Sequence, residues 1–238
     1  MKRILLIGIF GTYNYGCEAI VRGTVTQIRQ QYPDAYIAYA SMNIDDDIHR
    51  LRNCNVNFID SRKKNEKFTI HNIVRKICKE FGVMIEYTVF ANIKQTIKMY
   101  DVVISIGGDM YTLSPCGEYS TNISCIGNKC RKYSIPYIIW GCSIGPFESN
   151  LKAKKYYIEH LKNVTKIVAR EYVTTNYLKN IGIYNNVVCA PDPAFYVTPM
   201  EMRKNVNVIK KIGVNLSPHS ASYHYSNVEQ AISVQANE

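Results

Sequence analysis

The stretch Val102-Val103-Ile104-Ser105-Ile106-Gly107-Gly108-Asp109 decides the fold. A short, β-branched apolar run is typical of a buried strand, and here two glycines and an aspartate end that run in a turn. Similar runs recur along the chain and alternate with segments that have the period of a helix. The alternation predicts repeated βα units, and therefore an α/β protein with a Rossmann-like parallel sheet and flanking helices.

The same pattern assigns the regular elements of most of the chain. Strands are predicted at residues 3–9, 36–41, 56–59, 102–106, 137–140, 166–169, 187–190 and 212–216. Helices are predicted at residues 17–31, 70–81, 91–100, 119–133, 151–163 and 172–181, and Gly182 is expected to stop the last of them. The polar, mostly basic residues 60–70 are predicted to form an exposed loop, and the alternative is a basic rim beside an acidic ligand.

Length and composition indicate one large folded domain followed by the start of another. The chain has 238 residues, of which 47% are apolar and 20% charged, so it is too apolar to be disordered. We expect residues 1–200 to form an N-terminal Rossmann-like domain. Residues 201–238 would supply a linker and one βα unit, which is too short to close a core of its own and would begin an incomplete C-terminal domain.

The charge balance and the cysteines narrow the class of protein. A net charge of +10 favours acidic partners such as phosphate esters or anionic lipid. No nucleic acid partner is expected, because the 19 tyrosines do not form an RNA-binding signature. The eight cysteines are too sparse for a disulfide scaffold and too irregularly spaced for a zinc site, so we expect reduced thiols and no metal.

The distribution of apolar residues bears on location. No apolar stretch reaches the ~20 residues of a membrane span, and no signal peptide is apparent before or within the first predicted strand. A cytoplasmic protein is predicted. Its excess of Lys and Arg would also suit peripheral attachment to an anionic inner membrane face.

Ligands of open parallel α/β sheets gather at the carboxyl ends of the strands, and four loops in those positions have unusual composition. The first loop contains Asn14, Gly16 and Glu18. Its glycines let the backbone pass close to a ligand, and the helix that follows offers N–H groups and a partial positive charge to an anion. Glu18 is either a charge that is favourable in the first turn of a helix or a general acid or base.

The second loop follows the strand predicted at 102–106. Gly107 and Gly108 permit a tight turn or a close approach to a substrate. Asp109 could cap the next turn or accept hydrogen bonds from sugar hydroxyls.

The third loop, residues 140–147, is again rich in glycine. Gly141, Ser143 and Gly145 could place backbone N–H groups and a hydroxyl against phosphate or sugar oxygens. Covalent catalysis by Cys142 or Ser143 is not expected, since no nearby histidine supplies a base.

The fourth group of residues joins the ends of two neighbouring strands. Arg170 follows the strand predicted at 166–169, where its planar fork could hold a carboxylate or a phosphate through paired hydrogen bonds. The alternative is an ion pair with Glu171 or Asp192. Asp192 lies between two prolines, which favours a rigid turn. His160 and the other four histidines are assigned to polar or helical faces and loops, with no catalytic part.

Taken in order, these loops resemble the polysaccharide pyruvyl transferase family. The resemblance lies in GTYNYGCEAIVRGT (11–24), SIGGD (105–109), WGCSIGPF (140–147), AREYVTTNYLKNIG (169–182) and PDPAF (191–195), and it covers essentially all of residues 1–216. Many members of this family carry aspartate at the position of Cys17 and a third glycine at the position of Asp109.

The resemblance implies the N-terminal half of a two-domain architecture like that of GT-B glycosyltransferases, with the active site between the domains. It implies that phosphoenolpyruvate donates pyruvate to a sugar of a capsular or exopolysaccharide glycan, or of a lipid-linked oligosaccharide, to form a pyruvate ketal with release of phosphate. By similarity, Arg170 would hold the donor's carboxylate or phosphate, Glu18 would be the acidic residue at the helix start, and the glycine loops would shape the floor of the cleft. No cofactor beyond the donor is implied. Because the second domain is truncated, this form would be weak or inactive alone.

Two other functions stay open at this point. A nucleotide-sugar-dependent glycosyltransferase of the same architecture would need a nucleoside diphosphate site, most of which would lie in the second domain. A truncated chain could instead be an inactive remnant or a noncatalytic glycan-binding module.

Overall fold

The computed structural model describes residues 1–61, 90 and 92–198. They belong to one of the two compact units of the chain, Met1–Thr198, whereas the other unit, Pro199–Glu238, lies outside the described residues. The helix predicted at 70–81, most of the loop predicted at 60–70, and the strand and linker predicted within 201–238 lie outside them as well.

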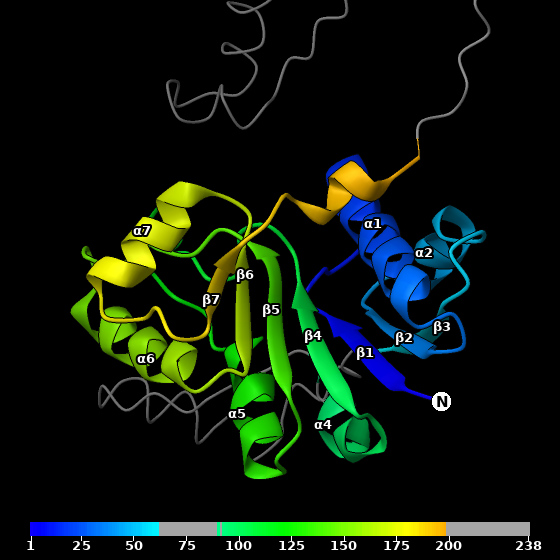
Figure 1. The fold of residues 1–238 in the computed structure, drawn as a ribbon, viewed down its shortest axis with the longest axis horizontal. Coiled ribbons are helices and arrows are strands. Elements are labelled where there is room, and N and C mark those ends of the chain that lie inside the picture. Colours follow the sequence, from blue (N-terminus) through cyan, green and yellow to red (C-terminus); the bar gives the residue numbers. More distant parts are fainter. Residues whose placement is uncertain (62–89, 91, 199–238) are drawn as a thin grey trace, which may run out of the picture. The chain divides into compact units, whose positions relative to one another are not determined.

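The described residues contain a seven-stranded sheet in the order β3-β2-β1-β4-β5-β6-β7, in which every neighbouring pair is parallel (Figure 1). This confirms the predicted α/β fold with a Rossmann-like parallel sheet. The strands are β1 (Arg3–Ile7), β2 (Tyr36–Ser41), β3 (Asn57–Asp60), β4 (Val102–Ile106), β5 (Tyr137–Cys142), β6 (Lys166–Ala169) and β7 (Val187–Cys189).

Helices connect these strands and cover both faces of the sheet. They are α1 (Tyr15–Gln31), α2 (Ile44–Arg50), α4 (Ile93–Thr96), η1 (Ile97–Met99), α5 (Ser124–Lys132), α6 (Leu151–Lys162), α7 (Tyr172–Asn180) and η2 (Pro193–Tyr196). Two helix predictions are wrong in detail, and one helix was missed. The helix predicted at 91–100 contains the short α4 and a 3-10 turn, α5 begins at 124 rather than 119, and α2 was not predicted.

Alternating residues of each central strand pack into two separate cores. Leu5 and Val103 face a core that is completed by α4, α5, α6 and α7. Leu6 and Ile104 face a second core, which α1 covers. Burial on both faces explains why the strands read as continuous apolar runs in the sequence.

The order of the strands reverses next to β1. The chain runs outward through β2 and β3, and then returns to place β4 on the other side of β1. Such a switch point opens a crevice at the carboxyl ends of the strands. Gly8 and Gly107 follow the two strands there, with φ of 119° and 127°, and a Cβ on Gly8 would lie 2.2 Å from the carbonyl oxygen of Ile106. Only glycine fits this close approach.

A search of the described helices finds none with the length and apolarity needed to cross a membrane.

Candidate functional site

The guanidinium of Arg170 gathers side chains from the ends of four adjacent strands. Arg170 follows β6, and its Nε donates to Oγ of Ser143, which follows β5, at 2.8 Å. Its Nη1 donates to Oδ2 of Asp192 after β7, and its Nη2 donates to Oδ1 of Asp109 after β4, both at 3.1 Å. The arginine side chain is still 26% exposed. A cationic centre with access to solvent therefore lies at the carboxyl edge of the sheet.

The turn after β4 forms the floor beneath this guanidinium. A Cβ on Gly108 would lie 2.7 Å from Nη1 of Arg170 and 3.1 Å from Cζ, so the arginine rests directly on the glycine backbone. The backbone N–H of Ser143 donates to the carbonyl of Gly108 at 2.7 Å and fixes the turn to the end of β5. The second and third glycine-rich loops are thus one connected surface.

The rest of the third loop is structural. Gly141 interrupts the register between β5 and β6 and lies against Pro193, and Gly145 lies against the ring of Tyr177. Cys142 is buried and its thiol donates to the carbonyl of Gly107 at 2.7 Å. Burial raises the pKa of this thiol to about 12, which suits packing and not nucleophilic attack.

The carboxylate of Asp192 accepts two hydrogen bonds and is also partly exposed. One carboxylate oxygen pairs with Arg170, and the other accepts from the backbone N–H of Ala194 at 2.9 Å and so caps η2. The side chain is 19% exposed. The rigid turn expected of a Pro-Asp-Pro sequence is present, and η2 packs against α1, where a Cβ on Gly23 would overlap the carbonyl of Pro193 (Figure 1).

Glu171 adds a further negative charge beside Arg170. Hydrogen bonds from Ser143 and Thr174 and the charge of Arg170 lower the pKa of Glu171, against the opposing effect of burial. The hydroxyl of Ser143 accepts from Arg170 and is also among the groups that lower the pKa of Glu171.

In the first loop, the polar groups bond mainly to one another. The side chain of Asn14 accepts from the N–H groups of Gly16 at 2.7 Å and Cys17 at 3.4 Å, and so caps α1. Two of the N–H groups expected to meet an anion are engaged in this way. Burial raises the pKa of Cys17, and the negative charge of Asp109 raises it further, so this helix start lies within electrostatic range of the Asp109 turn.

Glu18 lies in the first turn of α1 between two guanidinium groups. Its carboxylate is 2.7 Å from Nε of Arg22 and 3.7 Å from Nη1 of Arg50. Arg22 also donates to the backbone carbonyl of Arg50 and so joins α1 to α2. The side chain of Glu18 is 18% exposed and is not among the partners of Arg170. Both interpretations of Glu18, as a helix-start charge and as an acid–base residue, remain predictions.

Asp47 is a buried carboxylate that the sequence analysis missed. It accepts from the N–H of Thr12 at 2.8 Å, from the hydroxyl of Thr12 at 2.7 Å and from the hydroxyl of Ser41 at 2.7 Å. These bonds fix the loop after β1 to the end of β2. The signal was available, because three consecutive aspartates after a predicted strand favour the first turn of a helix.

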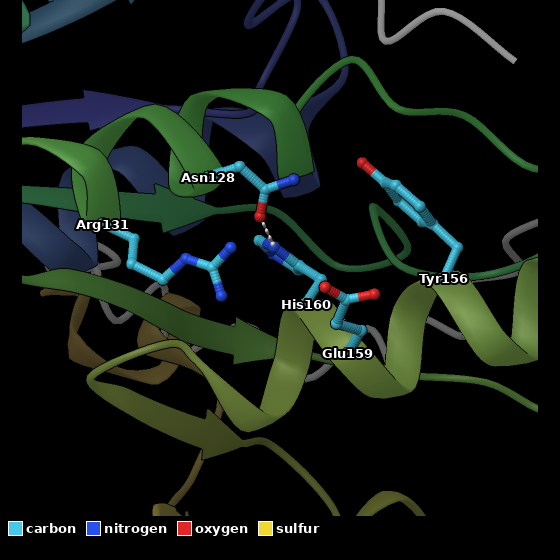
Figure 2. A pocket seen from close by; sticks show the side chains of 5 residues that line it. All are labelled: Asn128, Arg131, Tyr156, Glu159 and His160. Atoms are coloured by element: carbon cyan, nitrogen blue, oxygen red, sulfur yellow. Dashed lines mark hydrogen bonds between the residues drawn. The ribbon is translucent and has the colours of Figure 1, made fainter.

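His160 lies on a helix, as predicted, but on the buried face of α6. Its side chain is 3% exposed, stacks on the ring of Tyr111 with centroids 5.9 Å apart, and donates from Nδ1 to Oδ1 of Asn128 at 3.0 Å. It lies at the base of a pocket of about 360 Å³ between α5 and α6 (Figure 2). The other lining residues are Asn128, Arg131, Tyr156 and Glu159. The structure therefore adds burial to the predicted helical position of His160.

Comparison with known proteins agrees with the fold. The chain is similar to UDP-GlcNAc 2-epimerase from Neisseria meningitidis, solved with UDP-GlcNAc, with 12% identity, a TM-score of 0.50, and coverage of 82% of this chain and 47% of that one. It is similar to MnaA of S. aureus, solved with UDP, with 12% identity, a TM-score of 0.51, and coverage of 87% and 50%. Comparison with curated protein sequences finds no significant match.

This chain thus spans about half the length of those two proteins, and at this identity the likeness is one of fold alone. It supports the expected likeness to the N-terminal half of a GT-B-like enzyme. The family is shown by a different finding: the family model of polysaccharide pyruvyl transferases matches residues 14–235. The match includes the candidate site residues of all four loops, from Asn14 to Asp192, and this chain belongs to the polysaccharide pyruvyl transferase family.

Proposed function

We propose that this chain takes part in transfer of pyruvate from phosphoenolpyruvate to a sugar of a surface glycan, with Arg170 as the anchor of the donor. The observation that carries the proposal is the position of Arg170. Its guanidinium is partly exposed, rests on the glycine turn after β4, and is oriented by Ser143 and Asp192 at the carboxyl edge where ligands of this fold gather.

The reaction needs a cation for the donor and groups that move protons. A proton is added to the methylene carbon of the enol, one sugar hydroxyl attacks the neighbouring carbon, and a second hydroxyl displaces phosphate to close the ketal. The proton that the first hydroxyl loses balances the proton gained by the methylene carbon. The proton that the second hydroxyl loses leaves with the phosphate. Positive charge near the donor stabilises its carboxylate and the departing phosphate.

The residues of this chain divide these tasks between two places. Arg170 would bind the carboxylate or the phosphate through its planar fork, and the hydroxyl of Ser143 could contact a second oxygen. Glu18 would accept or deliver a proton in the part of the crevice next to the α1 start. Further donor and acceptor contacts would come from the second half of the architecture. A lipid-linked acceptor would place the protein at the inner face of a membrane, where its net charge of +10 favours anionic lipid.

The proposal is tested by measuring how phosphoenolpyruvate and nucleotide sugars each affect the full chain. Phosphoenolpyruvate should raise the melting temperature, because a ligand that binds only the folded state stabilises it, whereas uridine and guanosine diphosphate sugars should not. Phosphate release should require both phosphoenolpyruvate and a galactose- or glucose-containing acceptor, and NMR should detect the new ketal methyl group.

Stabilisation by a nucleotide sugar without any response to phosphoenolpyruvate would refute the proposal and favour a glycosyltransferase. Binding of a glycan without either donor would favour a glycan-binding module. The variant Arg170→Gln serves as the control that ties any phosphate release to this site.

A further inference from the structure

The present bonds of Arg170 leave it two unused N–H groups, one on Nη1 and one on Nη2. A guanidinium has five N–H donors. In this protein Nε, Nη1 and Nη2 each already donate one hydrogen bond, to Ser143, Asp192 and Asp109. Its face lies against Gly108. An anion that binds through the Nη2 N–H group that Asp109 now accepts from must therefore displace Asp109.

The three acceptors differ in how firmly they are held. Ser143 has its backbone N–H bonded to the carbonyl of Gly108 at 2.7 Å, which holds it to the turn after β4. Asp192 is 19% exposed and uses its second oxygen to cap η2. Asp109 is 76% exposed, and within residues 1–61 and 92–198 its carboxylate is hydrogen-bonded to Arg170 alone. Asp109 is thus the acceptor that can leave at the least cost.

The leaving motion is small. The backbone of the turn is fixed, because the carbonyl of Gly108 accepts from Ser143 and the carbonyl of Asp109 accepts from the hydroxyl of Thr112 at 2.9 Å. Rotation of the Asp109 side chain into solvent would free Nη2 without moving the loop.

The negative charge of Asp109 repels any anion that approaches Arg170. Arg170, Asp109 and Asp192 together carry a net charge of −1 when all three are ionised, and the donor brings further negative charge. Rotation of the Asp109 carboxylate into solvent would lower the repulsion between this carboxylate and the donor only in part. Removal of the carboxylate would leave Arg170 and Asp192 as a pair with no net charge. Both the occupied Nη2 and the like charge weaken the binding of an anion.

We propose that Asp109 sets the anion affinity of this site: its carboxylate occupies Nη2 of Arg170 in the free protein and competes with the carboxylate or phosphate of the donor. The inference rests on the proposed function, because it takes Arg170 to be the anion anchor. Asp109 is then a determinant of affinity and not a ligand of the substrate.

The experiment measures phosphoenolpyruvate and inorganic phosphate binding to the full chain, by calorimetry at low salt, for a double-mutant cycle. Asp109→Asn should bind both anions about 1.4- to 5-fold more tightly than the unmodified protein, since an exposed ion pair is worth about 0.2–1 kcal/mol. Asp34→Asn is the charge control, because Asp34 is exposed and lies between α1 and β2, at the opposite end of the strands. It should change affinity by less than Asp109→Asn does.

The second arm of the cycle uses Arg170→Gln. In that background the gain in affinity from Asp109→Asn should be smaller than in the unmodified protein, because only the like-charge repulsion is removed and the competition for Nη2 no longer exists. A merely structural role of Asp109 would not produce this dependence on Arg170. Asp109→Ser provides a second variant if the amide is poorly folded.

The outcomes separate the inference from the function on which it rests. If phosphoenolpyruvate binds in an Arg170-dependent manner but Asp109→Asn and Asp109→Ser leave the affinity unchanged or weaken it, the inference is wrong and the proposed function stands. An equal gain in the presence and absence of Arg170 also overturns the inference. If neither anion binds the unmodified protein or the Asp109 variants, the inference and the proposed anchor both fail.

Discussion

Arg170 and His160 are both basic side chains around which polar groups gather, and their surroundings are opposite. Arg170 is 26% exposed and donates to three acceptors from three other strand ends. His160 is 3% exposed, is stacked among tyrosine rings, and its Nε2 has no hydrogen-bond partner within the described part of the chain. Arg170 can keep its charge and meet a ligand, whereas His160 is held in its neutral form. A pocket beside a histidine is therefore weaker evidence of a site than a cation at a strand end.

The largest effect should be seen in the stability of the protein at acidic pH. Burial, and to a smaller extent the charge of Arg131, lowers the pKa of His160 from 6.5 to about 3. The unfolded chain takes up a proton below pH 6.5 and the folded chain does not, so this stability is present above pH 6.5 and is lost towards pH 3. The loss is about 1.4 kcal/mol per pH unit, or about 3 kcal/mol at pH 4. Urea unfolding at pH 7 and pH 4 measures it.

The matched variants are His160→Phe and His49→Gln, because His49 is exposed. The first should reduce the acid sensitivity by about 3 kcal/mol, and the second should leave it nearly unchanged. Equal acid sensitivity of the His160 variant and the unmodified protein would show that this histidine is hydrated or charged, and would break the contrast with Arg170.

Removal of the cation should have the next largest effect, and on binding. Arg170→Gln should weaken phosphoenolpyruvate binding by about 10- to 100-fold, since a hydrogen bond to a charged group contributes about 1.5–3 kcal/mol. Arg170→Lys keeps the positive charge but loses the planar fork. Its affinity for phosphoenolpyruvate should lie between those of the unmodified protein and Arg170→Gln. His160→Phe should bind the donor as the unmodified protein does. Calorimetric titrations of all four proteins at one ionic strength would expose a role of the α5–α6 pocket if the His160 variant lost affinity instead.

A smaller effect is expected from the floor of the site. Gly108→Ala would place a methyl group 2.7 Å from Nη1 of Arg170, so the guanidinium must shift. We expect donor affinity to fall about tenfold, which corresponds to about 1.4 kcal/mol. Gly11→Ala is the control, because the nearest atom to its Cβ is 3.4 Å away in the side chain of Tyr13. An unchanged affinity for Gly108→Ala would mean that the arginine need not rest on this turn.

The smallest effect is expected at Asn14, whose side-chain oxygen caps helix α1. Asn14→Ala should lower the free energy of unfolding by about 1 kcal/mol through loss of the α1 cap, and Asn14→Ser should restore most of it. The amide nitrogen could still donate to a ligand, as predicted for a substrate-binding residue. In that case donor or acceptor affinity should fall severalfold in both variants. If Asn14→Ser binds the donor and the acceptor as the unmodified protein does, Asn14 only caps the helix and does not bind substrate.

Much of the fold could be predicted because the strands follow simple rules. The strands at 36–41, 102–106 and 166–169 have the predicted bounds, since buried apolar runs that end in polar residues or glycine mark both ends. The misplaced start of α5 has a physical reason: residues 119–123 have helical spacing but form a turn that is fixed from outside, with Tyr157 donating to the carbonyl of Ser120 at 2.8 Å. Helix α2 has almost no apolar period, and it depends on burial of Asp47 by residues distant in sequence.

The site was predictable in its place and not in its partners. Parallel strands put their carboxyl ends at one edge, so the loops that hold Asp109, Ser143, Arg170 and Asp192 were expected together. That Asp109 pairs with Arg170 across 61 positions depends on strand order, which spacing does not reveal. His160 could have been placed, because Ala153, Tyr157 and Leu161 share its buried helix face.

The most direct test of the account is a structure of the full chain with phosphoenolpyruvate bound. We expect the carboxylate or the phosphate within hydrogen-bond distance of Arg170, with Asp109 turned into solvent and Asp192 still capping η2. A donor bound elsewhere, with Arg170 keeping all three of its present partners, would show that this arginine only ties the loops together and would contradict the account.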